Sequence, residues 1–213
     1  MSQSARLLYL IRHAATRANL ERPYVLQGRR TDLQLSDIGR GQAEAARRVL
    51  ENRSIHQVFS SPMRRARETA EIIAQPHNTP VQLIDDLVEC DVGRWEGLSW
   101  ETIRTRDPQE YQAFEADPAS VPYAGGESFQ QVHDRAVPAI ERLCREYSEG
   151  NTLIVTHNIV ARVYVAHVAG IAVRKARSIR QDNAGITVIS LADAQARLVT
   201  LNSIFHLDGL IFD

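Results

Sequence analysis

Residues 6–19 read RLLYLIRHAATRAN and place an apolar segment directly before a polar one. The apolar part, residues 6–11, includes an aromatic side chain and lacks a helical period, so it predicts a strand buried in a sheet. Polar side chains follow that strand at its carboxyl end, among them Arg12, His13, Thr16 and Asn19. Because ligands bind beyond the carboxyl ends of strands in open α/β sheets, this junction predicts a binding site.

Working outward from this junction, the chain alternates predicted helices with predicted strands. Ser36 predicts the cap of a helix over residues 37–51, with a buried face of Ile38, Gln42, Ala45, Ala46 and Val49. Ser61 followed by Pro62 predicts the start of a second helix, with a buried stripe of Met63, Ala66, Ala70 and Ile73. Further helices are predicted over 99–115, 127–147 and 159–169, and strands over 57–60, 81–83, 153–155, 186–191 and 197–201. We therefore expect an α/β fold with a mostly parallel sheet, antiparallel at one edge.

Polar residues at other strand ends extend the predicted site. Arg64 and Arg65 lie on the first turn of the helix after residues 57–60, and His157 follows residues 153–155. Arginine forks and helix N-termini bind phosphate oxygens. A neutral imidazole can attack phosphorus, and neighbouring guanidinium groups lower the pKa of a histidine in the direction that this attack needs. Glu89, on a loop after another strand, is a candidate acid for the leaving oxygen.

The composition narrows the class of protein. The 213 residues are 44% hydrophobic and 24% charged, as in globular proteins, and the net charge of -1 gives no electrostatic case for nucleic acid or a membrane surface. No stretch approaches the ~20 apolar residues of a membrane span. Cys90 and Cys144 are the only cysteines and suit a reducing compartment. No metal-binding spacing of His or Cys occurs. We expect a cytoplasmic protein that holds no metal.

The motifs, taken together and in order, resemble those of the histidine phosphatase superfamily, also called phosphoglycerate mutase-like. The segments that carry the resemblance are LIRHAATRAN (10–19), QGRRTDLQLSDIGRGQA (27–43), SSPMRRARETA (60–70), LVECDVGRWEGLS (87–99), GGES (125–128), IVTHN (154–158) and DNAGITVI (182–189). Ala14 and Asn158 depart from the family pattern, since glycine is common at both positions. A β-carbon at residue 14 matters if the backbone there needs a positive φ angle or a close approach.

The resemblance implies a three-layer α/β/α sandwich, formed by a single domain over residues 1–213 with a helical cap at 99–126. It implies His13 as the nucleophile and Glu89 as the acid, with Arg12, Arg65 and His157 around the phosphoryl oxygens. Of the two adjacent arginines, the resemblance places the family's arginine at Arg65 rather than at Arg64. The substrate-binding residues that it implies are Arg12, Thr16, Asn19, Gln27, Gly28, Arg65, His157 and Asn158. No cofactor is expected, because the arginines take the place of a metal.

The expected activity is hydrolysis of a small phosphomonoester through a phosphohistidine. Two alternatives remain open: a phosphoglycerate mutase, which returns the phosphoryl group to its substrate, and a non-catalytic phosphate-binding module. The segment ECDVGRWEG around Glu89 resembles the version of the phosphatase branch, and the chain has no counterpart of the basic insertion of the mutases. The substrate is not specified. Tyr111, Phe114 and Tyr123 either contact it or pack, and the oligomeric state, a homodimer included, is open.

Overall fold

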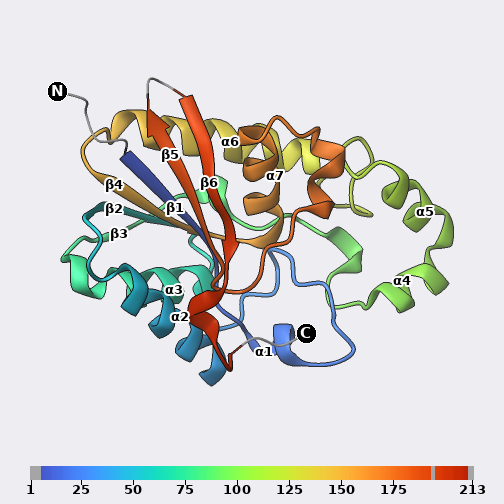
Figure 1. The fold of residues 1–213 in the computed structure, drawn as a ribbon. Helices are drawn as coiled ribbons and strands as arrows, with labels where there is room; N and C mark the ends of the chain where they lie inside the picture. The colour runs from blue at the N-terminus through green and yellow to red at the C-terminus, as the bar shows by residue number, and fades with distance from the viewer. Residues whose placement is uncertain (1–5, 193–194, 211–213) are drawn as a thin grey trace.

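The chain folds around a central sheet, seen in a computed structural model that describes residues 6–192 and 195–210 (Figure 1). Within the described residues the sheet has six strands in the order β3-β2-β4-β1-β5-β6. Their bounds are Arg6–Arg12 for β1, Ile55–Ser60 for β2, Val81–Leu83 for β3, Asn151–Thr156 for β4, Ile186–Ala192 for β5 and Gln195–Ser203 for β6. Strands β1 to β4 run parallel, whereas β5 is antiparallel to both of its neighbours. The predicted mostly parallel sheet with an antiparallel edge is confirmed.

Helices cover both faces of the sheet and make three layers (Figure 1). Helices α2 (Asp37–Leu50) and α3 (Arg64–Ala74) lie on one face, and α6 (Phe129–Glu146) and α7 (Asn158–Val168) lie on the other. Strand β1 contributes to both cores, because Leu8 and Leu10 pack with α6 and α7 while Tyr9 and Ile11 pack with α2 and α3. A strand buried on both faces explains why residues 6–11 are apolar without alternation.

Two shorter helices, α4 (Trp100–Arg106) and α5 (Pro108–Ala116), project beyond the end of the sheet (Figure 1). Asp107 separates them, as the Asp107–Pro108 pair predicts, since Pro108 takes the first position of α5. The remaining helical segments are α1 (Arg17–Leu20) and the 3₁₀ turns Gln75–His77, Asp85–Leu87, Gly93–Trp95, Val173–Ser178 and Phe205–Leu207. No helix among the described residues is long and apolar enough to cross a membrane.

Two details of the predicted helices are wrong. Val49 was expected on the buried face of α2, but it is 48% exposed, and Leu50 is buried in its place. Helix α3 begins at Arg64, with Met63 as its capping residue, so Pro62 precedes the helix rather than opening it. The Ser61 hydroxyl accepts a hydrogen bond from the Met63 N–H at 3.3 Å, but it does not cap the helix itself. The cap of α2 is as predicted, since Ser36 Oγ accepts a hydrogen bond from the Gly39 N–H at 3.0 Å.

The register of the central strands brings distant residues to one edge of the sheet. Arg12, the last residue of β1, pairs with Thr156, the last residue of β4. On the other side of β4, Ser60 at the end of β2 pairs with Val155. The His13 N–H donates to the Thr156 carbonyl at 2.8 Å, which continues the β1–β4 ladder by one residue. The polar segments after all three strands therefore begin side by side.

Candidate active site

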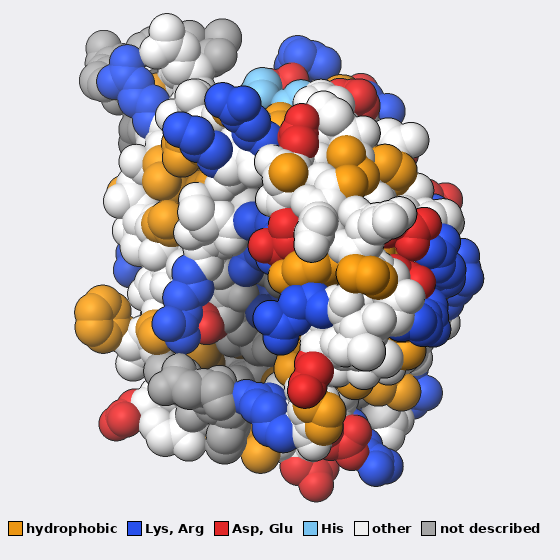
Figure 2. Space-filling view, turned by 90° about the vertical axis from the view of Figure 1, so that its right-hand side faces the viewer, with side chains coloured by type: hydrophobic (Ala, Val, Ile, Leu, Met, Phe, Trp, Pro, Cys, Tyr) orange, Lys and Arg blue, Asp and Glu red, His pale blue; other side chains and the backbone are white. Residues whose placement is uncertain are grey.

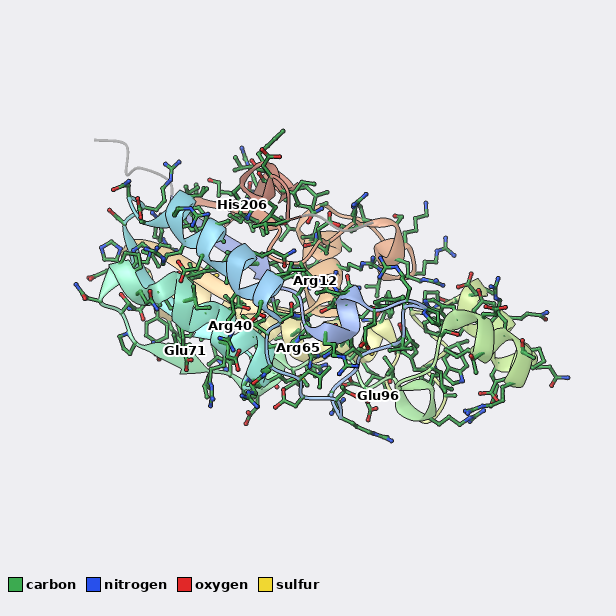
Figure 3. All side chains as sticks on the ribbon, turned by 90° about the horizontal axis from the view of Figure 1, so that it is seen from below. Arg12, Arg40, Arg65, Glu71, Glu96 and His206 are labelled. Carbon is green, nitrogen blue, oxygen red and sulfur yellow. The ribbon has the colours of Figure 1, made fainter. Side chains whose placement is uncertain are left out.

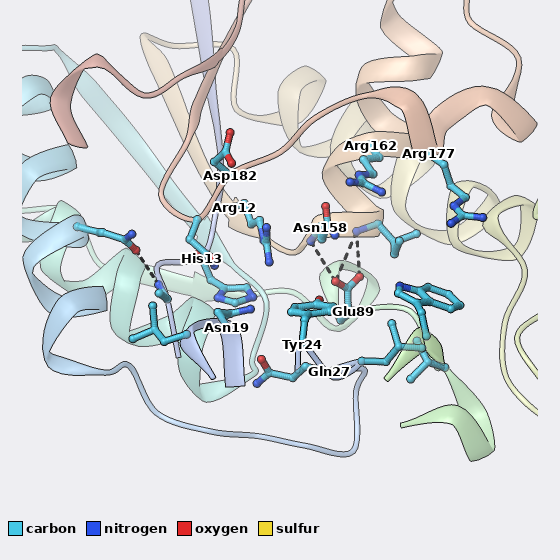
Figure 4. A pocket seen from close by; sticks show the side chains of 18 of the residues that line it. Arg12, His13, Asn19, Tyr24, Gln27, Glu89, Asn158, Arg162, Arg177 and Asp182 are labelled. Carbon is cyan, nitrogen blue, oxygen red and sulfur yellow. Dashed lines mark hydrogen bonds between the residues drawn. The ribbon is translucent and has the colours of Figure 1, made fainter. Parts of the chain in front are cut away.

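A cavity of about 540 Å³ lies at this edge of the sheet. Its lining comes from segments far apart in the chain, and Figure 4 shows several of these side chains converging on it. Figure 2 faces the side of the molecule that lies on the right in Figure 1. It shows a hollow near the centre of the view, bordered by basic side chains. The predicted residues in its wall are Arg12, His13, Asn19, Gln27, Glu89 and Asn158. A cavity of this size accommodates a small molecule.

His13 occupies the floor of the cavity and is only 3% exposed. Its Nδ1 lies 2.8 Å from the Ala14 carbonyl oxygen, which can only accept, so Nδ1 carries a proton. Its Nε2 lies 3.2 Å from Arg65 Nε, which can only donate. The two contacts together define a neutral imidazole with its lone pair at Nε2. Burial first, then the charges of Arg65 and Arg12, hold the pKa of His13 well below its usual range.

Arg65 is the buried arginine of α3, with a side chain that is 0% exposed. Besides His13, its guanidinium donates to the Thr31 carbonyl at 2.8 Å and to the Gly28 carbonyl at 3.0 Å. Neighbouring Arg64 is exposed and pairs with Glu68 instead. Figure 3 shows Arg65 with Arg12 in the middle of the molecule, while Arg40 and Glu71 lie along the outer helices. The structure therefore brings Arg65, and not Arg64, to His13.

Arg12 and His157 each present an unsatisfied nitrogen. Arg12 donates to the Gln181 carbonyl at 2.7 Å, but its Nε is buried and has no hydrogen-bond partner in the described chain. His157 is fully buried, and its ring centroid lies 5.2 Å from that of His13. Its Nε2 lies 2.8 Å from Ser61 Oγ, and its Nδ1 is likewise without a partner among residues 6–192 and 195–210. Burial first, then the charge of Arg65, lowers the pKa of His157 well below its usual range.

Glu89 is 4% exposed and sits against the N-terminus of α7. The Asn158 N–H donates to Oε2 at 3.0 Å, and the Ile159 N–H donates to Oε1 at 3.2 Å (Figure 4). Burial raises the pKa of Glu89, although the Cys90 N–H and the charges of Arg65 and Arg12 act in the opposite direction. Burial disfavours the ionised carboxylate, so this side chain holds a proton more readily than an exposed glutamate does.

Several of the predicted binding residues act behind the cavity wall. Thr16 is fully buried, and its hydroxyl lies 3.0 Å from both Asn19 Oδ1 and Gln27 Oε1. Thr16 thus contacts two side chains of the wall while lying outside it. Gly28 contributes its carbonyl to Arg65, and neither Arg65 nor His157 is in the wall itself. The predicted residues therefore fall into two groups. One group lines the cavity and includes His13, and the other lies behind the lining residues.

Part of the cavity wall consists of residues that the sequence does not predict as site residues. Arg22 and Tyr24 come from the loop after α1, a stretch with no periodic signal. Arg162 follows Asn158 by four residues on α7, so the helical period places both on one face, which was the available signal. Arg177 belongs to a basic run, Arg174, Lys175, Arg177 and Arg180, whose composition favours a solvated face over a contact with an anionic substrate. It lines the cavity instead, with its guanidinium 5.5 Å from the ring centroid of Trp100.

Ala14 fits its position without strain. It is fully buried, its N–H donates to Thr69 Oγ1 at 3.1 Å, and it is not among the described residues with positive φ. Its side chain packs in a small apolar cluster with Leu35 and Leu207. The backbone therefore makes no demand for glycine at residue 14.

The site combines an unprotonated, buried imidazole with buried guanidinium groups and a carboxyl group of raised pKa. Those are the components of phosphoryl transfer through histidine, in which the cations bind the phosphoryl oxygens. The described part of the chain has no group of three or more His, Cys, Asp or Glu side chains arranged to hold a metal ion.

Comparison with known proteins identifies the family of the chain. The model of the histidine phosphatase superfamily (branch 1) matches residues 8–204. The chain belongs to this superfamily. It is similar to phosphoserine phosphatase 1 of Hydrogenobacter thermophilus, with 29% identity over 94% of this chain and 93% of the relative. As a histidine phosphatase it is an enzyme, a phosphoric monoester hydrolase.

Solved histidine phosphatase-like structures have the same fold. YhfR of Bacillus stearothermophilus superposes with a TM-score of 0.86 at 28% identity, over 94% of this chain and 98% of that one. The α-ribazole phosphatase of Shigella flexneri gives a TM-score of 0.83 at 29% identity, over 92% and 96% of the two chains. These matches confirm the predicted family and the three-layer α/β/α fold.

Proposed function

We propose that this histidine phosphatase hydrolyses a small phosphomonoester, without a metal ion, through a phosphohistidine on His13. The observation that carries the proposal is the 3.2 Å hydrogen bond from Arg65 Nε to His13 Nε2, because only an unprotonated nitrogen can accept it. The lone pair that accepts this bond is the one that attacks phosphorus. On binding, the Arg65 Nε–H transfers its hydrogen bond from the imidazole to a phosphoryl oxygen.

Arg12, Arg65 and His157 stabilise the phosphoryl oxygens in the transition state. Arg12 Nε and His157 Nδ1 have no partner among the described residues, so both are available to an incoming anion. For His157 to donate from Nδ1 while neutral, Ser61 must donate its hydroxyl proton to Nε2, a direction that the 2.8 Å contact permits. Donors of this kind, held in a water-poor site, each contribute about 3 kcal/mol to transition-state stabilisation.

Glu89 supplies the proton in the first step and removes one in the second. As the His13 Nε2–P bond forms and the P–O bond breaks, the protonated Glu89 carboxyl gives its proton to the leaving oxygen. The resulting carboxylate then takes a proton from water, the water oxygen attacks phosphorus, and the P–N bond breaks to release phosphate. Burial, which raises the pKa of Glu89, favours the protonated form needed at the start.

The ester portion of the substrate lies under residues 99–126, which we propose act as a cap within a single domain. Trp100 and Tyr123 from this segment line the cavity, while Phe114 is fully buried among aromatic rings. The names of the compared relatives, phosphoserine phosphatase and α-ribazole phosphatase, favour a metabolite rather than a nucleic acid as the partner. Both described cysteines are buried and unpaired, which suits the cytoplasm.

The covalent scheme is tested by labelling. With a 32P-labelled phosphomonoester, rapid acid-free quenching of the wild-type chain should trap labelled protein whose label is lost in acid. His13→Ala should lose both label and turnover, whereas His56→Ala, which changes an exposed histidine of β2, should keep both. EDTA should leave wild-type turnover unchanged. A His13→Ala chain that still incorporates label would refute the scheme.

Hydrolysis is favoured over the mutase reaction by the cap. Arg104, Thr105 and Arg106 are the nearest substitute for the basic insertion of the mutases, and all three are exposed on α4. We expect 31P NMR of 3-phosphoglycerate, with a trace of 2,3-bisphosphoglycerate, to show free phosphate without equilibration to 2-phosphoglycerate. Rapid equilibration without phosphate release would make the chain a mutase. A folded chain inactive on all phosphomonoesters would be a binding module.

A further inference from the structure

The far end of the cavity carries a cation that the phosphatase mechanism does not use. Arg162 lies on α7 and lines the cavity. It is one helical turn, about 6 Å, beyond Asn158, whose N–H binds Glu89. Figure 4 shows its side chain beyond Asn158, toward Arg177 and away from His13. Arg162 therefore lies on the side of Glu89 where the ester portion of a substrate must extend.

Arg162 also has no ion-pair partner among the described residues. Its side chain is partly buried, its Nε is buried without a hydrogen-bond partner, and no carboxylate in the described part of the chain forms an ion pair with it. Burial first, then the nearby charge of Arg12, lowers its pKa. A buried polar group without a partner is costly and uncommon in native proteins, more so when it is charged.

The other charged side chains of that end are already engaged. Arg177 forms an ion pair with Glu115 and stacks over the rings of Trp100 and Phe114. Asp182 lies at the other end of the cavity, beside Arg12, and pairs with Arg180 and with the Asn202 amide (Figure 4). Glu89 accepts backbone hydrogen bonds from α7. Glu89 acts on Arg162 only through its nearby charge, and none of these groups forms an ion pair with it, so its guanidinium is available to an anionic group of the ligand.

We propose that the substrate carries a carboxylate a few bonds beyond the ester oxygen, and that Arg162 binds it. This inference rests on the proposed function, since it takes the phosphoryl group to be held by Arg12, Arg65 and His157. A carboxylate suits the site because it can accept two parallel N–H bonds from a guanidinium fork. Arg162 is then a specificity-determining residue for this phosphatase.

Two pairs of esters isolate the carboxylate. O-phospho-L-serine and O-phosphoethanolamine differ only by this group, and 3-phosphoglycerate differs from glycerol 3-phosphate by a carboxylate in place of a hydroxymethyl group. The wild-type chain should have a kcat/KM higher for the carboxylate-bearing member of at least one pair by about 10- to 100-fold, the range for a hydrogen bond to a charged group.

Variants of Arg162 should change that ratio. Arg162→Met should lower it by about 10- to 100-fold, and Arg162→Lys should lower it less, because lysine keeps the charge but not the fork. Arg104→Met, which removes an exposed arginine of α4, is the matched control and should keep the wild-type ratio. The circular dichroism spectra and the Tm of each variant establish that it is folded.

The outcomes separate this inference from the proposed function. Equal losses on both members of each pair in Arg162→Met would assign Arg162 to the phosphoryl group and refute the inference, as would a wild-type chain that does not discriminate within either pair. Absence of turnover on every ester, p-nitrophenyl phosphate included, would instead refute the proposed function.

Discussion

Arg64 and Arg65 are adjacent residues of α3, but their side chains lie in different environments. Arg65 is fully buried and donates to His13, Thr31 and Gly28, whereas Arg64 lies at the surface beside Glu68. The two side chains are chemically identical and one residue apart, so any difference between their variants reports the environment alone. They form a natural matched pair for mutation.

Arg65→Lys should reduce kcat/KM by at least about 100-fold, because a lysine cannot reproduce three directed donors and a phosphoryl contact. Arg64→Lys should stay within a few-fold of the wild type, since its ion pair with Glu68 is half exposed. Steady-state kinetics on p-nitrophenyl phosphate measures both. Comparable losses in the two variants would mean that Arg65 has no special role in transition-state binding.

Glu89→Gln should have an effect that depends on the leaving group. The substitution removes the proton donor, so esters of ordinary alcohols, whose oxygen needs that proton, should lose far more activity than p-nitrophenyl phosphate, which has a good leaving group. Comparing kcat on an alkyl phosphate with kcat on p-nitrophenyl phosphate gives the answer. Equal losses on both would reduce Glu89 to a positioning role or to water activation.

The sequence predicts those site residues that directly follow a strand and fails for those that depend on tertiary contacts. His13 and His157 are predictable because β1 and β4 end immediately before them, and strand ends can be located from apolar runs. Arg22 and Tyr24 could not be predicted as wall residues, because an irregular loop carries no period from which its direction can be inferred. Their placement depends on the other elements around the cavity.

At the scale of elements, the backbone of the loop that carries Glu89 is held by hydrogen bonds to the ion pair of Arg135 with Glu127 rather than by secondary structure. Arg135, on α6, donates to the Glu89 carbonyl at 3.3 Å and to the Asp86 carbonyl at 2.7 Å. Glu127 holds Arg135 by a 3.0 Å contact and also accepts from the Asp91 N–H at 2.9 Å. Both side chains are mostly buried, so this network links helix α6 to the loop that carries Glu89.

Glu127→Gln should lower the free energy of unfolding by about 1.5–3 kcal/mol, the range for hydrogen bonds to charged groups, and should lower kcat as well. Glu71→Gln is the matched control, because its 3.5 Å contact with Arg67 is exposed on both sides and should contribute less than about 0.5 kcal/mol. Urea denaturation and activity measured on the same samples test both effects. An unchanged denaturation midpoint for Glu127→Gln would show that the network does not stabilise the fold.

Helix boundaries are the features that the sequence predicts least well. The Ser61–Pro62 pair has the composition of a helix start, yet α3 begins at Arg64. Ser61 is fully buried, and its hydroxyl contacts His157 rather than capping the helix. The same hydroxyl also accepts from the Met63 N–H at 3.3 Å, so the tertiary contact with His157 is added to a local one, and no local pattern can anticipate that addition.

At the scale of the whole molecule, the buried histidines make folding depend on pH. The pKa values of His13 and His157 are lowered in the folded chain, so between those values and 6.5 the unfolded chain binds more protons than the folded one. The stability is therefore complete above pH 6.5 and falls as the pH decreases. Partly buried His206 and His77 shift in the same direction.

The free energy of unfolding should fall below pH 6.5 with a slope approaching about 1.4 kcal/mol per pH unit for each of His13 and His157. His157→Asn removes one such group and should flatten the curve by about that amount. Urea titrations between pH 5 and 8 measure it. A pH-independent free energy over this range would contradict neutral, buried histidines. Glu89, with its raised pKa, has the opposite sign and loses stability as the pH rises from 4.5 through its folded value.

The pairing of β1 with β4 at the centre of the sheet has a kinetic consequence. His13 and His157 adjoin only because these two strands are neighbours, although most of the chain separates them. Contacts between residues so distant along the chain close a long loop and tend to make folding slow. Local helices such as α2 can form early, but His13 meets His157 only when the two halves of the chain dock. During refolding, catalytic activity should thus return only after β1 has paired with β4, so the recovery of turnover reports when these two strands have docked.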